Sequence, residues 1–160
     1  MSKKLVILVA EDDPNDLELL RHVVADHGVE VNFQPAHDGE QVISYLRGEG
    51  EFADRVLYPI PDILVLDLKM PRVNGFEVLQ WLRQQPGLAR IPAVVLSGSG
   101  LETDIEEAYR LGANTYFTKP GQLAELRKII GSLIDYWRRS QRPIITAPET
   151  PPDGSRQPPD

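Results

Sequence analysis

Short apolar runs alternate with amphipathic stretches along most of the chain. Three of the runs, at residues 5–10, 63–66 and 93–96, are continuous and rich in β-branched side chains. Such runs are typical of strands that are buried on both faces of a parallel sheet. Weaker alternation at residues 31–33 predicts a further strand, and residues 115–118 predict a fifth.

A stretch with helical periodicity follows each run. In the first stretch, Leu17 and Leu20 lie on one face. Asp13 is placed to cap this helix, Pro14 suits its first position, and Asp16 stands where the partner of a capping box belongs. Further helices are predicted over residues 40–47, 76–82, 103–112 and 123–137. Five strands, each followed by a helix, predict the α/β class: a doubly wound five-stranded parallel sheet of order 2-1-3-4-5 with flavodoxin-like topology.

Two segments depart from this alternation of strands and helices. Residues 48–61 are long for a connection that usually takes ~2–6 residues, and they include the apolar residues Phe52 and Leu57. The segment is either a tolerated surface insertion or a loop that contacts a partner. Residues 141–160 contain six prolines and few apolar residues. We therefore expect a domain of residues 1–140 and a Pro-rich disordered tail of residues 141–160.

The composition is that of one globular domain and excludes several kinds of site. The chain has 160 residues, 41% of them hydrophobic and 26% charged. It has no cysteine, so there is no disulfide and no thiolate metal site. A net charge of −7 argues against direct contact with nucleic acid or an anionic membrane, because both require a basic face. The apolar run at residues 5–10 is too short for a membrane span or a secretory signal, so we expect a cytoplasmic protein.

Polar side chains follow the buried runs at the point where each run ends. They are Glu11 and Asp12 after the first run, Asp67 after the third strand, Ser97 after the fourth and Lys119 after the fifth. Because the carboxyl ends of parallel strands meet at one edge of a sheet, we expect these side chains to converge. Asp13 also follows the first run, but helix capping accounts for it.

Such a cluster of carboxylates predicts a metal site. Ionised carboxylates at close range repel one another, so either one of them takes a proton or a cation lies between them. Oxygen ligands favour a hard cation such as Mg²⁺. A carboxylate beside Mg²⁺ can attack phosphorus and form an aspartyl phosphate. Lys119 would pair with a phosphate oxygen, the Ser97 hydroxyl would donate a hydrogen bond to another, and the Gly98 N–H could approach closely.

Taken together, these residues resemble the receiver domain of two-component response regulators. The matching motifs are Ile7 through Pro14 with its acidic run, Leu66 through Pro71 with Asn74-Gly75, Leu96-Ser97, and Lys119-Pro120. The resemblance covers about residues 4–138. It implies that Asp67 accepts a phosphoryl group from a sensor histidine kinase. It also implies that Asp12 and Asp67 hold Mg²⁺ with the backbone carbonyl of Lys69, while Glu11 contacts the ion through water.

The resemblance also implies a route for the signal. Ser97 and Tyr116 would be the switch pair, in which Ser97 turns toward the phosphate and Tyr116 swings inward behind it. The altered surface would be the face of the fourth helix, fifth strand and fifth helix, read by a downstream protein or a histidine phosphotransfer partner. Three features are similar to the receivers that serve bacterial phytochromes: the long segment before the third strand, residues 108–114, and Tyr136-Trp137. This likeness implies a bacteriophytochrome as the kinase and a homodimer through the same face.

The leading hypothesis is therefore a stand-alone signalling module and not an enzyme. One alternative is a Mg²⁺-dependent phosphohydrolase with an aspartyl-phosphate intermediate. Such enzymes typically carry an acid/base aspartate two residues after the nucleophile, where this chain has Lys69. The other alternative is a binding module that never takes phosphate, against which the complete set of polar residues argues.

Overall fold

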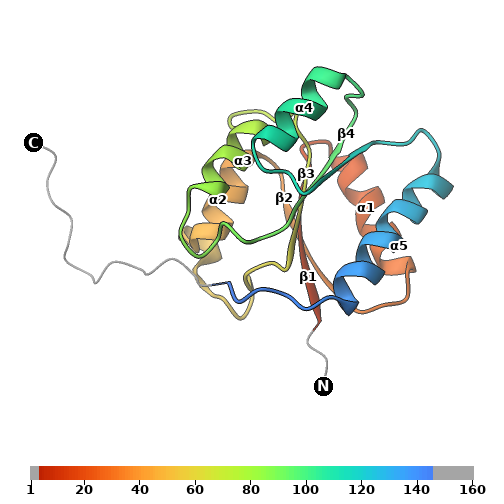
Figure 1. Ribbon diagram of the computed structural model, residues 1–160. Helices are drawn as coiled ribbons and strands as arrows, with labels where there is room; N and C mark the ends of the chain where they lie inside the picture. Colours follow the sequence, from red (N-terminus) through yellow and green to blue (C-terminus); the bar gives the residue numbers. More distant parts are fainter. Residues whose placement is uncertain (1–3, 146–160) are drawn as a thin grey trace, which may run out of the picture.

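Five parallel strands form a single sheet in the order β2-β1-β3-β4-β5 in the computed structural model, which describes residues 4–145 (Figure 1). The strands are β1 (Leu5–Ala10), β2 (Val31–Ala36), β3 (Ile63–Leu66), β4 (Ala93–Ser97) and β5 (Thr115–Thr118). The helices are α1 (Pro14–Asp26), α2 (Gly39–Arg47), the short 3-10 helix η1 (Gly50–Ala53), α3 (Gly75–Arg83), α4 (Glu102–Arg110) and α5 (Leu123–Arg139). The predicted fold class and strand order are confirmed.

Helices cover both faces of the sheet. Helices α1 and α5 lie on one face, and α2, α3 and α4 lie on the other (Figure 1). Successive strand residues alternate between the two cores: Leu8 and Leu64 pack with α2, α3 and α4, whereas Ile7 and Ile63 pack with α1 and α5. Because both faces are buried, the strand ends are where polar chemistry can reach solvent. Within residues 4–145, no helix is long and apolar enough to cross a membrane.

The segment between α2 and β3 is packed against the domain. The rings of Tyr45, Phe52 and Tyr58 form a cluster with centroids 5.2 to 6.0 Å apart. The Arg55 guanidinium donates hydrogen bonds to carbonyls at the end of α2, at 2.8 Å to Tyr45 O and 2.8 Å to Leu46 O. These contacts add to the cap of the helix end, where Tyr45 O also accepts the N–H of Gly48 at 3.0 Å. Contact of this segment with a partner stays a prediction.

The chain continues past α5 along the domain. Of the expected tail, residues 141–145 are described and residues 146–160 lie outside the described residues. Arg142 Nη1 lies 3.5 Å from Asp62 Oδ2, and the same carboxylate oxygen accepts the N–H of Val6 at 2.8 Å. Ile145 packs against the core formed with α2, α3 and α4. Residues 141–145 thus run against the domain. Through Asp62, which binds both Arg142 and Val6, the chain after α5 is linked to β1 and to the residue before β3.

The start of α3 presses against the end of β3. Asn74 caps α3 in a capping box with Glu77, and the Gly75 N–H donates to Leu68 O at 2.9 Å. A Cβ atom at Gly75 would lie 2.3 Å from Asp67 O and 2.7 Å from Leu68 Cα. No side chain fits there, so glycine at this position sets how closely the helix approaches the segment that carries Asp67.

Substitution at this contact should destabilise the fold. Gly75→Ala forces the backbone apart, and we expect it to lower the free energy of unfolding by about 1–3 kcal/mol. Gly121→Ala is the matched control, because a Cβ there meets nothing within 4 Å; it should stay within about 0.5 kcal/mol of the native chain. Urea unfolding of the three proteins measures both values. Equal stability of the two variants would contradict the close approach.

Candidate functional site

Three carboxylates meet where β1 and β3 end. The two strands are neighbours with Ala10 opposite Leu66, so the residues that follow, Glu11 and Asp67, emerge side by side. The Asp67 N–H donates to Ala10 O at 3.1 Å and extends this pairing by one residue. One carboxylate oxygen from each of Glu11, Asp12 and Asp67 lies within 4.8 Å of the others. The structure therefore brings the three predicted acids together.

Two of the three acids are buried. Glu11 is 2% exposed and Asp67 is 6% exposed, whereas Asp12 is open to solvent. Burial raises the pKa of Glu11 from 4.5 to about 7, and the negative charge of Asp67 adds to the effect. Hydrogen bonds from Lys119 and from the Asp13 N–H act in the opposite direction without cancelling it. Negative charge at this edge of the sheet is therefore only partly compensated.

Lys119 is the cation of the site. Its Nζ lies 2.6 Å from Glu11 Oε2 and 3.1 Å from Asp67 Oδ2. Its backbone N–H donates to Ser97 O at 2.7 Å, which fixes where the side chain starts. Burial by itself lowers the pKa of Lys119, but the hydrogen bond to Glu11 and the charge of Asp67 outweigh it and raise the pKa above its ordinary value. Lys119 thus stays charged and offsets part of the acidic charge.

Asp16 is a site residue that the sequence pattern missed. Its Oδ2 lies 3.2 Å from Lys119 Nζ. The capping-box role expected for Asp16 is wrong, because the Asp13 N–H that it should accept donates to Glu11 Oε1 at 3.1 Å instead. The cap itself is confirmed: Asp13 Oδ1 accepts the N–H of Asn15 at 2.8 Å. The position of Asp16 in the first turn after β1 was the signal that could have placed it at the strand edge.

The expected switch residues lie beside this cluster. Ser97 is fully buried, and its Oγ accepts the N–H of Ser99 at 3.3 Å. Tyr116 is half-buried on β5, and its hydroxyl donates to Ser99 O at 2.7 Å. The Tyr116 N–H in turn donates to the hydroxyl of Tyr109 on α4 at 3.1 Å. Hydrogen bonds therefore link the end of β4 to β5 and α4.

Lys69 and Gly98 lie just after the ends of β3 and β4. The Lys69 N–H lies 3.4 Å from Asp67 Oδ1, while its side chain is exposed. Gly98 is exposed, and a Cβ there would meet nothing within 4 Å. The space beside Gly98 is thus free of other protein atoms. The expected contact of the Gly98 N–H with a phosphate stays a prediction.

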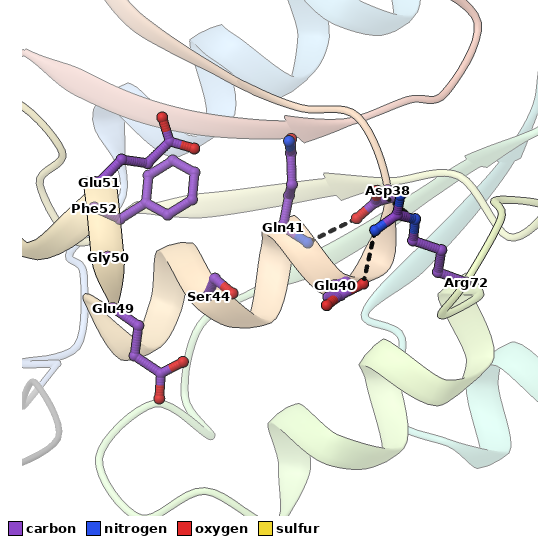
Figure 2. A pocket seen from close by; sticks show the side chains of 9 residues that line it. All are labelled: Asp38, Glu40, Gln41, Ser44, Glu49, Gly50, Glu51, Phe52 and Arg72. Carbon is purple, nitrogen blue, oxygen red and sulfur yellow. Dashed lines mark hydrogen bonds and ion pairs between the residues drawn. The ribbon is translucent and has the colours of Figure 1, made fainter.

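A hollow lies elsewhere on the surface. It has a volume of about 400 Å³ and is lined by α2, η1 and Arg72 (Figure 2). Arg72 pairs with two of the four acids of the hollow, with Nη1 3.4 Å from Glu40 Oε2 and Nε 3.9 Å from Asp38 Oδ2, and the other two are Glu49 and Glu51. The backbone N–H of Gln41 donates to Asp38 Oδ1 at 2.8 Å. None of the expected site residues lines it. The volume of the hollow therefore does not make it the candidate functional site. The expected site residues lie instead at the acidic cluster of Glu11, Asp12 and Asp67.

Known proteins are similar to this chain in both fold and sequence. Residues 7–131 match the response regulator receiver domain, and the chain belongs to that family. It is 34% identical over 132 residues to the response regulator Rcp1 of Synechocystis sp., covering 82% of this chain and 88% of Rcp1. The phosphorylated cyanobacterial phytochrome response regulator RcpA has a similar structure, with 35% identity, a TM-score of 0.81, and coverage of 88% of this chain and 99% of RcpA. The resemblance to receivers and to phytochrome response regulators is confirmed.

A second similar structure bears on the metal. The Mn²⁺-bound form of Rcp1 shares 32% identity with a TM-score of 0.76, covering 91% of this chain and 99% of Rcp1. Receivers of this family are signalling proteins that bind divalent cations. The residues here fit such an ion, because they offer only oxygen ligands and leave buried negative charge incompletely compensated.

The raised pKa of Glu11 predicts a pH dependence of stability without metal. Because its folded-state pKa of about 7 exceeds 4.5, the folded chain binds this proton more tightly than the unfolded chain. The free energy of unfolding should therefore fall as pH rises from about 4.5 to 7. Glu11→Gln removes this loss, so its stability relative to the native chain should rise on the order of 2 kcal/mol between pH 5 and pH 8.

Urea unfolding at both pH values, with a chelator present, measures this difference. Comparing variant with native chain at each pH cancels the other titrating groups. A stability difference that is the same at pH 5 and pH 8 would show that Glu11 is not desolvated.

Proposed function

We propose that the chain accepts a phosphoryl group on Asp67 from a sensor histidine kinase, in the presence of Mg²⁺. The observation that carries the proposal is the pairing of a buried carboxylate with a half-buried ammonium: Asp67 Oδ2 lies 3.1 Å from Lys119 Nζ beside the acidic cluster. The two oxygens of Asp67 differ in their surroundings, since Oδ1 faces the N–H of Lys69. The carboxylate is thus held in a fixed orientation at the rim of the sheet, where a phosphohistidine of the kinase can approach it.

In the proposed reaction, a carboxylate oxygen of Asp67 forms a bond to phosphorus as the bond to the kinase histidine nitrogen breaks. Asp12, Asp67 and the carbonyl of Lys69 would hold Mg²⁺, with Glu11 contacting it through water. The ion supplies positive charge that stabilises the oxygens of the transferring group. Lys119 pairs with one phosphoryl oxygen. The Ser97 hydroxyl and the Gly98 N–H donate to the others.

We propose that the switch operates through the loop after β4. If Ser97 turns toward the phosphoryl group, it releases the N–H of Ser99 that it now accepts. Ser99 O is also the acceptor for the Tyr116 hydroxyl. Movement of this loop therefore changes the position of Tyr116 and the packing of β5 against α4. Phosphorylation favours the second conformer as a population shift, and the α4–β5–α5 face carries the signal and a homodimer.

The proposed partners follow from the likeness to RcpA and Rcp1. We propose a bacteriophytochrome as the kinase and a downstream protein or histidine phosphotransfer protein as the receiver of the signal. The site of action would be the cytoplasm, and residues 1–140 would form the working domain. A net charge of −7 supports the absence of direct nucleic-acid contact.

The competing phosphohydrolase is less well supported. Its general acid would lie two residues after Asp67, but that position is Lys69, whose side chain is exposed and carries no carboxylate. A leaving alkoxide would lack a proton donor from this position. Turnover of small phosphoesters that stops in Asp67→Asn would favour this alternative.

Phosphorylation should map to a single residue. After incubation of the chain with candidate sensor kinases, ATP and Mg²⁺, we expect the intact mass to rise by one phosphoryl group. Asp67→Asn should show no adduct, because its amide is a far weaker nucleophile. Asp26→Asn is the control, since Asp26 pairs with Arg127 on the surface, and it should be labelled like the native chain. An adduct retained in Asp67→Asn would contradict the assignment.

The switch can be observed without a kinase. Beryllofluoride, a mimic of an acyl phosphate, should shift the amide resonances of Ser97 and Tyr116 when Mg²⁺ is present, and should leave them unchanged in Asp67→Asn. The shift follows from the shared contacts of both residues with Ser99. Two-dimensional NMR of the labelled chain measures it. Unshifted resonances in the native chain would favour a binding module that takes no phosphate.

A further inference from the structure

The ammonium of Lys119 has three carboxylate partners, and one of them stands outside the cluster that would hold a cation. Lys119 Nζ lies 2.6 Å from Glu11, 3.1 Å from Asp67 and 3.2 Å from Asp16. An ammonium has three N–H donors, so one is available for each carboxylate. Glu11 and Asp67 follow strands, whereas Asp16 comes from the first turn of α1.

Two cations compete for Glu11 and Asp67: the ammonium of Lys119 and the divalent cation that the acidic cluster would hold. Both acids belong to the group of oxygens that lie within 4.8 Å of one another and suit a divalent cation. A cation bound there repels the nearby ammonium and takes up the negative charge that holds it. Lys119 must therefore loosen its contacts with Glu11 and Asp67 when the cation enters. Asp16 is not part of that group, so its charge remains available to Lys119.

The surroundings of Asp16 suit this role. Its N–H donates to Asp13 Oδ1 at 3.2 Å, which fixes its backbone in the cap of α1. The N-terminus of a helix stabilises a negative charge. The Asp16 side chain is 46% exposed against 22% for Lys119, so Asp16 is the more solvent-accessible member of the pair. Because the backbone of Lys119 is held by Ser97 O, only its side chain needs to move.

We propose that Asp16 is a positioning residue for Lys119. Its carboxylate retains the ammonium at the mouth of the cluster when a divalent cation occupies the neighbouring acids, and so keeps Lys119 ready for a phosphoryl oxygen. The inference deepens the proposed function and rests on it, since it takes the acidic cluster as the Mg²⁺ site.

The test is the affinity for Mg²⁺ alone, measured by calorimetry at constant ionic strength. In Asp16→Asn the ammonium loses its alternative partner and competes more strongly for Glu11 and Asp67. We expect Mg²⁺ binding to weaken about two- to fivefold, as for the loss of one half-exposed ion pair. Asp16→Glu should restore the native affinity. Glu18→Gln, which removes a charge from the outer side of α1 where Glu18 pairs with Arg21 and His22, should leave it unchanged.

The same comparison in a Lys119→Met background separates the lysine from a general effect of charge. Without the ammonium, Asp16→Asn should change the Mg²⁺ affinity less than about 1.5-fold, because the coupling between the two residues is absent. An equal loss in both backgrounds would overturn the proposal, since Asp16 would then act directly on the ion. Native affinity in Asp16→Asn itself would overturn it as well.

These outcomes are distinct from failure of the proposed function. A native chain that binds Mg²⁺ and is phosphorylated on Asp67, with Asp16→Asn unaltered in affinity, overturns only the role of Asp16. A native chain that takes up no Mg²⁺ overturns the proposed function, and the role of Asp16 falls with it.

Discussion

The ion pairs of Lys119 are the interaction on which the rest of this structure depends. Two carboxylates, those of Glu11 and Asp67, are buried side by side at the end of a hydrophobic sheet. Such burial is tolerated where a cation compensates the charge or one carboxyl group takes a proton. A single ammonium does so incompletely, as the raised pKa of Glu11 shows. The domain therefore folds with an excess of negative charge at one edge, and this excess is what makes a divalent cation a fitting ligand.

Much of the fold and part of the site could be predicted from the sequence, because both depend on buried strands. Continuous apolar runs identify strands covered on both faces, and the residues that end them must meet at one edge. The pairing of Ala10 with Leu66 then brings Glu11 beside Asp67. These features follow from the order of residues along the chain and the geometry of a parallel sheet alone.

Other contacts could not be predicted, because they join segments with no common pattern. In the sequence, the position of Asp16 fits a capping box as well as it fits a site residue. Only the path of β5 brings Lys119 to it. Arg55 reaches back to carbonyls of α2, a contact that depends on how residues 48–61 close on themselves. The pairing of Arg142 with Asp62 likewise requires the position of the chain after α5. In each case a long side chain crosses between elements, and the pattern of residues along the chain does not specify which partner it reaches.

The most direct test of the central claim is where a divalent cation binds. Substoichiometric Mn²⁺ broadens the NMR signals of nearby amides, and the account predicts selective broadening at Glu11, Asp12 and Asp67, with the side-chain signals of Lys119 shifted. Broadening confined to the acidic hollow lined by α2 and η1, with the amides at the ends of β1 and β3 unaffected, would contradict it.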